Sequence, residues 1–213
     1  MKFSCPLLLI LLSVFSFSSV LAQEIKLNDI PYPLNLTNPS PDCRVTSHNS
    51  IVLKAPGHTD LFISPDGKFE INNSPRLMFR PDSSFVLTSK VKPDLKSKWD
   101  AGVLLVYNDA KHFAKFCFER DLDGRARVVS VVCNETADDC NSMIIDGNEV
   151  FYRIVGSAKG PTFEFHYSTD GKSWFPIRTF RLHKADNISI GFSAQSPTGK
   201  ECNVEFSGIE LKQ

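Results

Sequence analysis

The sequence lacks an excess of charge of either sign. Its 24 Lys and Arg residues balance its 24 Asp and Glu residues, so the formal net charge at pH 7 is zero. Proteins that bind nucleic acid or anionic membranes through electrostatics carry a basic patch or a positive charge balance. We therefore expect neither nucleic acid nor a membrane as a partner.

The sequence also lacks the signatures of common enzyme and metal sites. Its histidines are scattered, and none has metal-ligand spacing with another. There is no Gly-Xaa-Ser-Xaa-Gly elbow, no nucleotide-binding loop and no zinc motif. Asp121-Leu-Asp-Gly begins like a calcium loop, but the later ligands and the terminal Glu are missing. No residue is predicted to be catalytic or to bind a metal, and no cofactor is expected.

A hydrophobic run at the N-terminus is the clearest targeting signal. Lys2 supplies a positive charge, an apolar run extends from Pro6 to Phe17, and Val20-Leu21-Ala22 has the small residues of a cleavage site. The run is short for a bilayer span, which takes about 20 residues, although an uncleaved signal anchor is the alternative. We predict a signal peptide over residues 1–22 and a secreted, extracellular protein.

Secretion would expose the cysteines to an oxidising compartment, where disulfides persist. Cys133 and Cys140 bracket a short loop, and Cys43 and Cys202 lie near opposite ends of the domain. We predict these two pairs as disulfides. Cys117 is left as an inert packing residue.

Four Asn-Xaa-Ser/Thr sequons accompany the signal peptide and predict a glycoprotein. They begin at Asn35, Asn72, Asn134 and Asn187.

The remaining pattern is that of an all-β protein. Residues 23–48 are rich in proline and predict an extended N-terminal arm that forms no sheet strand. Residues 49–213 read as short strands with turn signals roughly every ten residues and no amphipathic helix. Such a pattern favours a jelly-roll sandwich of two antiparallel sheets, with an up-and-down barrel as the alternative.

The central hairpin runs from Asp100 to Glu119. Its first half is apolar on both faces, which is typical of a strand covered on both sides. Its second half alternates, so Ala114, Phe116 and Phe118 share one face because strand side chains have period two. The other face carries Phe113, Lys115, Cys117 and Glu119.

The candidate ligand-binding residues follow from this open face. Lys115 and Glu119 could orient a polar ligand such as a sugar, and Arg153 and His166 are candidates for sharing that face. The alternative is a solvated ion pair worth at most about 1 kcal/mol. Glu119 and Asp121 could instead serve as the two carboxylates of a glycosidase, but the Asp123-Gly124 turn predicts a strand end near Arg120.

Several stretches resemble one family in order and spacing. They are Ala55-Pro-Gly-His-Thr-Asp-Leu-Phe, Asn73-Ser-Pro-Arg-Leu, Asp100-Ala-Gly-Val-Leu, Phe113-Ala-Lys-Phe-Cys-Phe-Glu, Phe165-His-Tyr-Ser-Thr-Asp-Gly-Lys-Ser-Trp and Gly191-Phe-Ser-Ala-Gln-Ser-Pro. Together they are similar to a domain-of-unknown-function family of concanavalin-A-like β-sandwiches that includes regulation-of-enolase-type proteins. The resemblance implies a concanavalin A-like jelly roll of the lectin and glucanase type with a concave face, and it implies no activity.

These observations lead to a ranked expectation of function. We expect a non-catalytic, lectin-like module whose ligand is a carbohydrate or glycan. A glycoside hydrolase or lyase on the same scaffold, and an interaction domain without a small ligand, are the alternatives. The sequence gives no indication of the oligomeric state.

Overall fold

The computed structural model describes residues 25–213, which form strands and no helix. This part of the chain therefore contains no helix long and apolar enough to cross a membrane. The signal peptide predicted over residues 1–22 lies outside the described residues.

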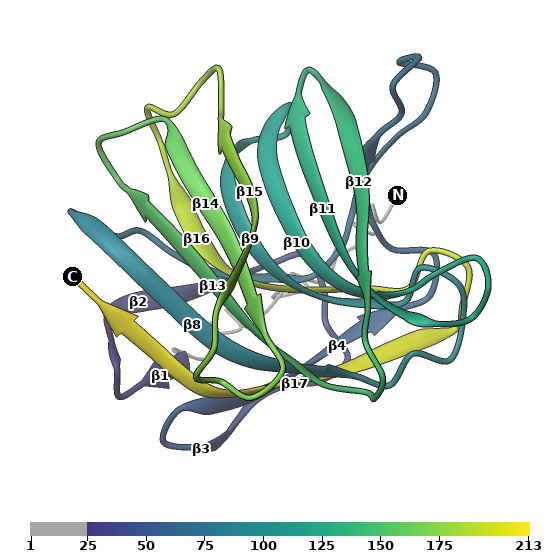
Figure 1. The fold of residues 1–213 in the computed structure, drawn as a ribbon, viewed down its shortest axis with the longest axis horizontal. Helices are drawn as coiled ribbons and strands as arrows, with labels where there is room; N and C mark the ends of the chain where they lie inside the picture. The colour runs from purple at the N-terminus through teal and green to yellow at the C-terminus, as the bar shows by residue number, and fades with distance from the viewer. Residues whose placement is uncertain (1–24) are drawn as a thin grey trace, which may run out of the picture.

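Two antiparallel sheets pack face to face, as Figure 1 shows. The larger sheet has eight strands in the spatial order β1-β2-β7-β16-β9-β10-β11-β12. Their bounds are β1 Ile25–Leu27, β2 Ile30–Thr37, β7 Arg76–Phe79, β16 Ser189–Gln195, β9 Ala101–Asp109, β10 His112–Arg120, β11 Ala126–Asn134 and β12 Thr136–Ile144.

The smaller sheet has seven strands in the order β15-β14-β13-β8-β17-β4-β3. Their bounds are β15 Phe175–Arg181, β14 Thr162–Ser168, β13 Val150–Ser157, β8 Ser84–Pro93, β17 Glu201–Lys212, β4 Ser50–Pro56 and β3 Cys43–Ser47. A separate hairpin is formed by β5 Leu61–Ile63 and β6 Glu70–Asn72. The predicted concanavalin A-like jelly-roll sandwich is confirmed.

The main core lies between the two sheets and follows from the alternation of side chains. In β4, every second residue is buried, because one face meets the larger sheet and the other faces outward. Aromatic rings bridge the layers: Phe116 of the larger sheet stacks on Tyr152 and Phe165 of the smaller one, with ring centroids 3.8 and 4.7 Å away. Such stacked pairs add to the burial of apolar area.

The first strand of the central hairpin, β9, is buried on both faces, as predicted. The second strand, β10, is buried on both faces as well, so the prediction that its Lys115 face is open is wrong. Phe116 and Phe118 belong to the core between the sheets, whereas Phe113 and Cys117 belong to a second cluster on the outer face of the larger sheet. Leu61 and Ile63 of the β5–β6 hairpin complete this second cluster. The outer face is therefore partly covered, and its Lys115 and Glu119 side chains are buried.

The arm predicted over residues 23–48 is wrong from Ile25 onward, because this segment contributes strands to both sheets. β2 pairs with β7 over Asn35–Thr37, and β3 pairs with β4. Pro31 and Pro33 lie in the part of β2 that β7 does not reach, where a missing N–H interrupts no pairing with that strand.

Both predicted disulfides are absent from the described residues, where all five cysteines are free. Cys133 lies opposite Ala137, whereas Cys140 lies opposite Ser130, three positions along the strand. An odd offset puts the two side chains on opposite faces of the sheet, about 10 Å apart along the strand direction. A disulfide requires Cα atoms within about 7 Å.

The pair of Cys43 and Cys202 fails for a different reason. Cys43 lies opposite Leu53 and Cys202 lies opposite Ala55, so the two residues flank β4 from its two sides. Two strand spacings separate them by about 10 Å, which is too far for a bond.

Candidate functional site

A cavity of about 450 Å³ opens on the outer face of the larger sheet, and we call it the Lys115 cavity. Its floor comes from β10, β11, β12 and β16, and its walls come from the β5–β6 hairpin and the loops that precede β9 and follow β16. The lining residues are Asp60, Phe62, Phe69, Ile71, Trp99, Lys115, Glu119, Val129, Val131, Asp139, Asn141, Gln195, Pro197 and Thr198.

Lys115 is the centre of a hydrogen-bonded network on this floor. Its Nζ donates to Asp60 Oδ1 at 2.9 Å and to Gln195 Oε1 at 3.1 Å, and the side chain is almost fully buried. Its ammonium also lies 5.7 Å from the centre of the Phe62 ring. Burial opposes the charged form, but the carboxylate of Asp60 outweighs it and holds the pKa of Lys115 above its ordinary value. Lys115 is therefore a fixed cation at the base of the cavity.

Glu119 lies four residues after Lys115 on β10, and its side chain favours the neutral form, whereas that of Lys115 is charged. Burial raises its pKa from 4.5 to about 8, although the charge of Lys115 acts in the opposite direction. Burial likewise raises the pKa of Asp139, which lines the same cavity from β12. At neutral pH Glu119 is mostly protonated, so its carboxyl group can donate as well as accept a hydrogen bond.

Two exposed aromatic side chains line the same cavity. Phe69 is 54% exposed and Trp99 is 39% exposed. Trp99 has a φ of 65°, in the left-handed region that bulky residues rarely adopt. Its carbonyl accepts from Gln195 Nε2 at 3.2 Å, so Gln195 connects Trp99 to Lys115. The tryptophan is thus held in a strained conformation beside the polar floor.

The structure separates the four predicted ligand-binding residues into two pairs. Lys115 and Glu119 line the cavity, but Arg153 and His166 face each other on β13 and β14 of the smaller sheet. The prediction that all four share one face is wrong. The guanidinium carbon of Arg153 instead lies 3.8 Å from the centre of the Trp174 ring, and His166 Nε2 lies 3.0 Å from Glu164 Oε2.

Asp121, the second carboxylate of the hydrolase alternative, is engaged in a turn. β10 ends at Arg120, as predicted, and Asp121 is not among the residues that line the cavity. Burial acts to raise its pKa, but hydrogen bonds from the Arg125 backbone and from Arg127 outweigh burial and lower the pKa to about 2. Asp121 therefore stabilises the turn as a carboxylate.

The four sequons differ in their surroundings. The side chains of Asn35, Asn72 and Asn187 are exposed. Asn134 is half-buried, and its amide donates to the carbonyl of Arg181 and accepts from the N–H of His183. A glycan on Asn134 would have to displace this contact, and glycosylation at all four sites stays a prediction.

One group among the described residues has the spacing of metal ligands. Asp94, Asp100 and Cys202 each offer an atom within 4.8 Å of the others. However, Asp100 accepts hydrogen bonds from Ser196 and from the Lys96 and Ser97 backbone, and Asp94 is paired with Lys96. The protein itself satisfies these carboxylates.

A family described as "Protein of unknown function (DUF1349)" matches residues 36–213. No curated protein matches the chain.

Solved structures share the fold at low sequence identity. A functionally unknown protein from Saccharomyces cerevisiae is 22% identical, with a TM-score of 0.75 over 84% of this chain and 95% of that one. Xylan beta-1,4-xylosidase from Bacillus halodurans C-125 is 13% identical, with a TM-score of 0.60 over 83% of this chain but only 40% of the xylosidase. Alginate lyase from Alteromonas sp.272 is 10% identical, with a TM-score of 0.55 over 84% and 93% of the two chains. At these identities the likeness concerns the fold.

Proposed function

The chain belongs to the DUF1349 family of proteins of unknown function, and we propose that it is a secreted, non-catalytic carbohydrate-binding protein whose site is the Lys115 cavity. The family carries no activity to inherit, so the proposal rests on the chemistry of the cavity.

The observation that carries the proposal is a polar floor next to exposed aromatic rings. Lys115, Asp60 and Gln195 form a preorganised set of donors and acceptors, and Glu119 adds a protonated carboxyl group. Trp99 and Phe69 offer apolar ring faces in the same cavity. A sugar ring presents hydroxyl groups at its edge and C–H groups on its faces, so it matches such a lining. A few convergent polar groups in a largely apolar pocket are typical of a small-ligand site.

The proposal is consistent with the named activities of some structural neighbours. One is named for xylan and another for alginate, both of which are polysaccharides. This support is limited to the fold, and the chain spans about two fifths of the xylosidase. The expected likeness to regulation-of-enolase-type proteins stays a prediction.

A panel of glycans and polysaccharides tests the proposal. We expect the purified protein to bind a subset of the panel, and the Trp99→Ala and Phe69→Ala variants to lose that binding while remaining folded. Phe175→Ala is the matched control, because Phe175 is 50% exposed and lies on β15 of the other sheet. If the protein bound no glycan or polysaccharide of the panel at high protein concentration, the carbohydrate proposal would be ruled out and an interaction domain would be favoured.

Glu119 gives specific support to a second candidate, a glycoside hydrolase or lyase. A carboxyl group with a pKa near 8 in a cavity is poised to act as a general acid at neutral pH. Because Asp121 is held in its turn, Asp139 or Asp60 would have to supply the second carboxylate. Incubation with each bound polysaccharide decides between the candidates: products that disappear in Glu119→Gln support the enzyme, and unchanged substrate supports the binding protein.

The secreted location depends on the residues of the predicted signal peptide. Expression in a eukaryotic host should place the protein in the medium, beginning near Gln23, with a mass that falls after removal of N-glycans. Retention in the cell with residues 1–22 attached would contradict this part of the proposal.

A further inference from the structure

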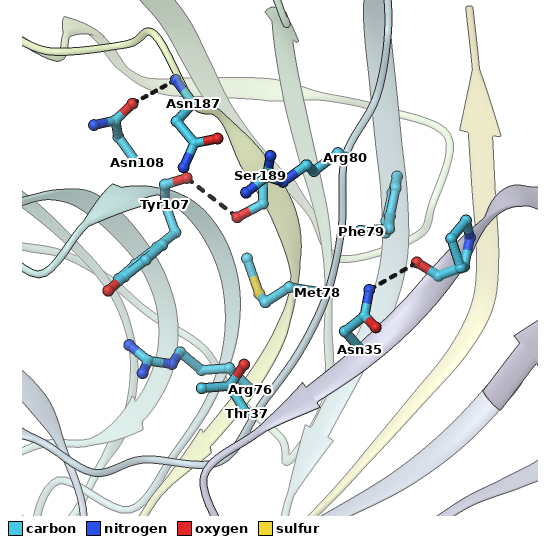
Figure 2. A pocket seen from close by; sticks show the side chains of 11 residues that line it. Asn35, Thr37, Arg76, Met78, Phe79, Arg80, Tyr107, Asn108, Asn187 and Ser189 are labelled. Atoms are coloured by element: carbon cyan, nitrogen blue, oxygen red, sulfur yellow. Dashed lines mark hydrogen bonds between the residues drawn. The ribbon is translucent and has the colours of Figure 1, made fainter. Parts of the chain in front are cut away.

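A second cavity, of about 570 Å³, is lined by residues on or next to β2, β7, β9 and β16 of the larger sheet, and we call it the Arg76 cavity. Figure 2 shows the side chains that line it. They are Pro33, Asn35, Thr37, Arg76, Met78, Phe79, Arg80, Tyr107, Asn108, Asn187 and Ser189. None of the residues of the Lys115 cavity is among them, so the two sites are distinct.

The lining of this cavity carries two positive charges and no carboxylate. Arg76, Met78 and Arg80 occupy alternate positions along and just beyond β7, so their side chains leave the strand on the same side. In Figure 2, Arg76 lies beside the ring of Tyr107, and Arg80 lies on the other side of Met78. A ligand above Met78 would lie between the two guanidinium groups.

Arg76 is the stronger indication of a ligand, because it is 5% exposed and its partners are uncharged. One guanidinium nitrogen donates to Asn72 Oδ1 at 2.8 Å, and the group lies 4.8 Å from the centre of the Tyr107 ring. A buried cation is normally paired with an anion, because its desolvation costs several kcal/mol. Within residues 25–213, no carboxylate forms an ion pair with Arg76.

Arg80 adds a second cation, exposed at the cavity and without an ion pair among the described residues. The carboxylate of Asp109, which Asn108 contacts, already binds His112 and Lys184. Among residues 25–213, no carboxylate therefore serves as a counter-charge for either arginine.

We propose that the Arg76 cavity binds a hydroxylated carboxylic acid, such as a uronic acid. The planar guanidinium groups suit a carboxylate, which they can bind with paired hydrogen bonds. Thr37 and Asn187 offer a hydroxyl group and an amide for the ligand's hydroxyl groups, and Met78 and Phe79 offer apolar contact. The inference does not depend on what the Lys115 cavity binds.

Two of the predicted sequons lie on the wall of this cavity, at Asn35 and Asn187. A glycan on either would stand at the ligand's entrance. The binding experiment therefore uses both the secreted protein and its Asn35→Gln/Asn187→Gln variant, which keeps both amides but cannot be glycosylated there. Enzymatic deglycosylation that converts Asn to Asp is unsuitable, because it adds negative charge beside the arginines.

Isothermal titration with galacturonate and galactose tests the proposal, because the two sugars differ only at C6, where galacturonate has a carboxylate and galactose a hydroxymethyl group. We expect galacturonate to bind and galactose to bind at least about tenfold more weakly, the effect of losing a charge-assisted hydrogen bond. Raising the salt concentration should weaken the binding of galacturonate.

Arg80→Gln should weaken galacturonate binding at least about tenfold and is expected to fold, since Arg80 is exposed. Arg76→Gln should weaken it further, with circular dichroism as the folding control. Arg181→Gln, which removes an exposed arginine from β15, is the matched control and should have no effect. Equal binding of galactose, insensitivity to Arg80→Gln, or loss of binding in a Lys115→Ala variant that circular dichroism shows to be folded would each overturn the proposal. It would also be overturned if neither the secreted protein nor its Asn35→Gln/Asn187→Gln variant bound galacturonate, or if galactose 6-phosphate bound in place of galacturonate.

Discussion

Glu119 makes the stability of the protein depend on pH in a direction opposite to that of most paired carboxylates. Its pKa is about 8 in the folded protein, raised chiefly by burial, against 4.5 for an ordinary glutamate. Between these values the folded protein keeps the proton and the unfolded chain releases it. The free energy of unfolding must therefore fall as the pH rises from about 4.5 to about 8. At about 1.36 kcal/mol per pKa unit, the whole contribution is of the order of 5 kcal/mol.

Glu119→Gln isolates this contribution, because glutamine resembles the protonated side chain and does not titrate. Urea unfolding at several pH values between 5 and 8 gives the free energy of unfolding of both proteins. Asp100 and Asp139 also have raised pKa values and lower the stability over part of the same range, so the difference between the two proteins is the informative quantity. We expect the variant and the parent to be similar near pH 5 and the variant to be the more stable by several kcal/mol at pH 8.

The similarity near pH 5 is the internal control, since both proteins then have a neutral side chain at this position. A difference that stays constant from pH 5 to pH 8 would refute the reasoning, because Glu119 would then titrate alike in the folded and unfolded chains. A difference of opposite sign would mean that Lys115 dominates over burial.

Three further predictions concern the rest of the fold. Gly102→Ala should lower the free energy of unfolding by about 1–3 kcal/mol, because the new Cβ would lie 2.6 Å from methyl groups of both Val91 and Val204. Urea titration measures the change, and unchanged stability would contradict this packing. In the folded protein, a thiol reagent should modify Cys140 first, because it is the exposed cysteine among the described residues, and mass spectrometry identifies the modified residue. Protection of Cys140 by a disulfide to Cys133 would contradict the register of β11 and β12. Asp170→Ala should lower the melting temperature measured by calorimetry, because the Asp170 carboxylate accepts hydrogen bonds from the N–H groups of Lys172 and Ser173, and Asp170→Asn should lower it less.

The strands were predictable because period-two alternation is a local property of the sequence. The central hairpin shows this best: its two faces separate as the pattern indicates, with Phe116 in the core and Lys115 on the other side. The N-terminal strands were missed because prolines normally argue against pairing. They are tolerated where β2 extends beyond its neighbour β7, and that geometry is set by strands distant in the sequence.

The site was only half predictable for the same reason. Lys115 and Glu119 share a strand, so their common face could be read directly. Asp60 and Gln195, which bind Lys115, lie 55 and 80 residues away in sequence and meet it only through the order of the strands. Arg153 was misplaced because alternation assigns a side chain to a face of its own sheet but does not say which sheet that is. Trp99 carried no periodic signal, since it lies in the loop before β9.

The polar network around Lys115 is costly for the fold, and that cost favours a functional role. Its neighbours on the same face, Val103, Cys117 and Val131, form an apolar cluster, so a hydrophobic residue at position 115 would have fitting surroundings. Replacement of a buried ion pair by apolar residues is often neutral or stabilising. Burial of a protonated glutamate nearby adds a penalty that grows with pH. Stability alone therefore gives no reason for charged groups at this position, whereas a ligand that needs fixed donors and acceptors does.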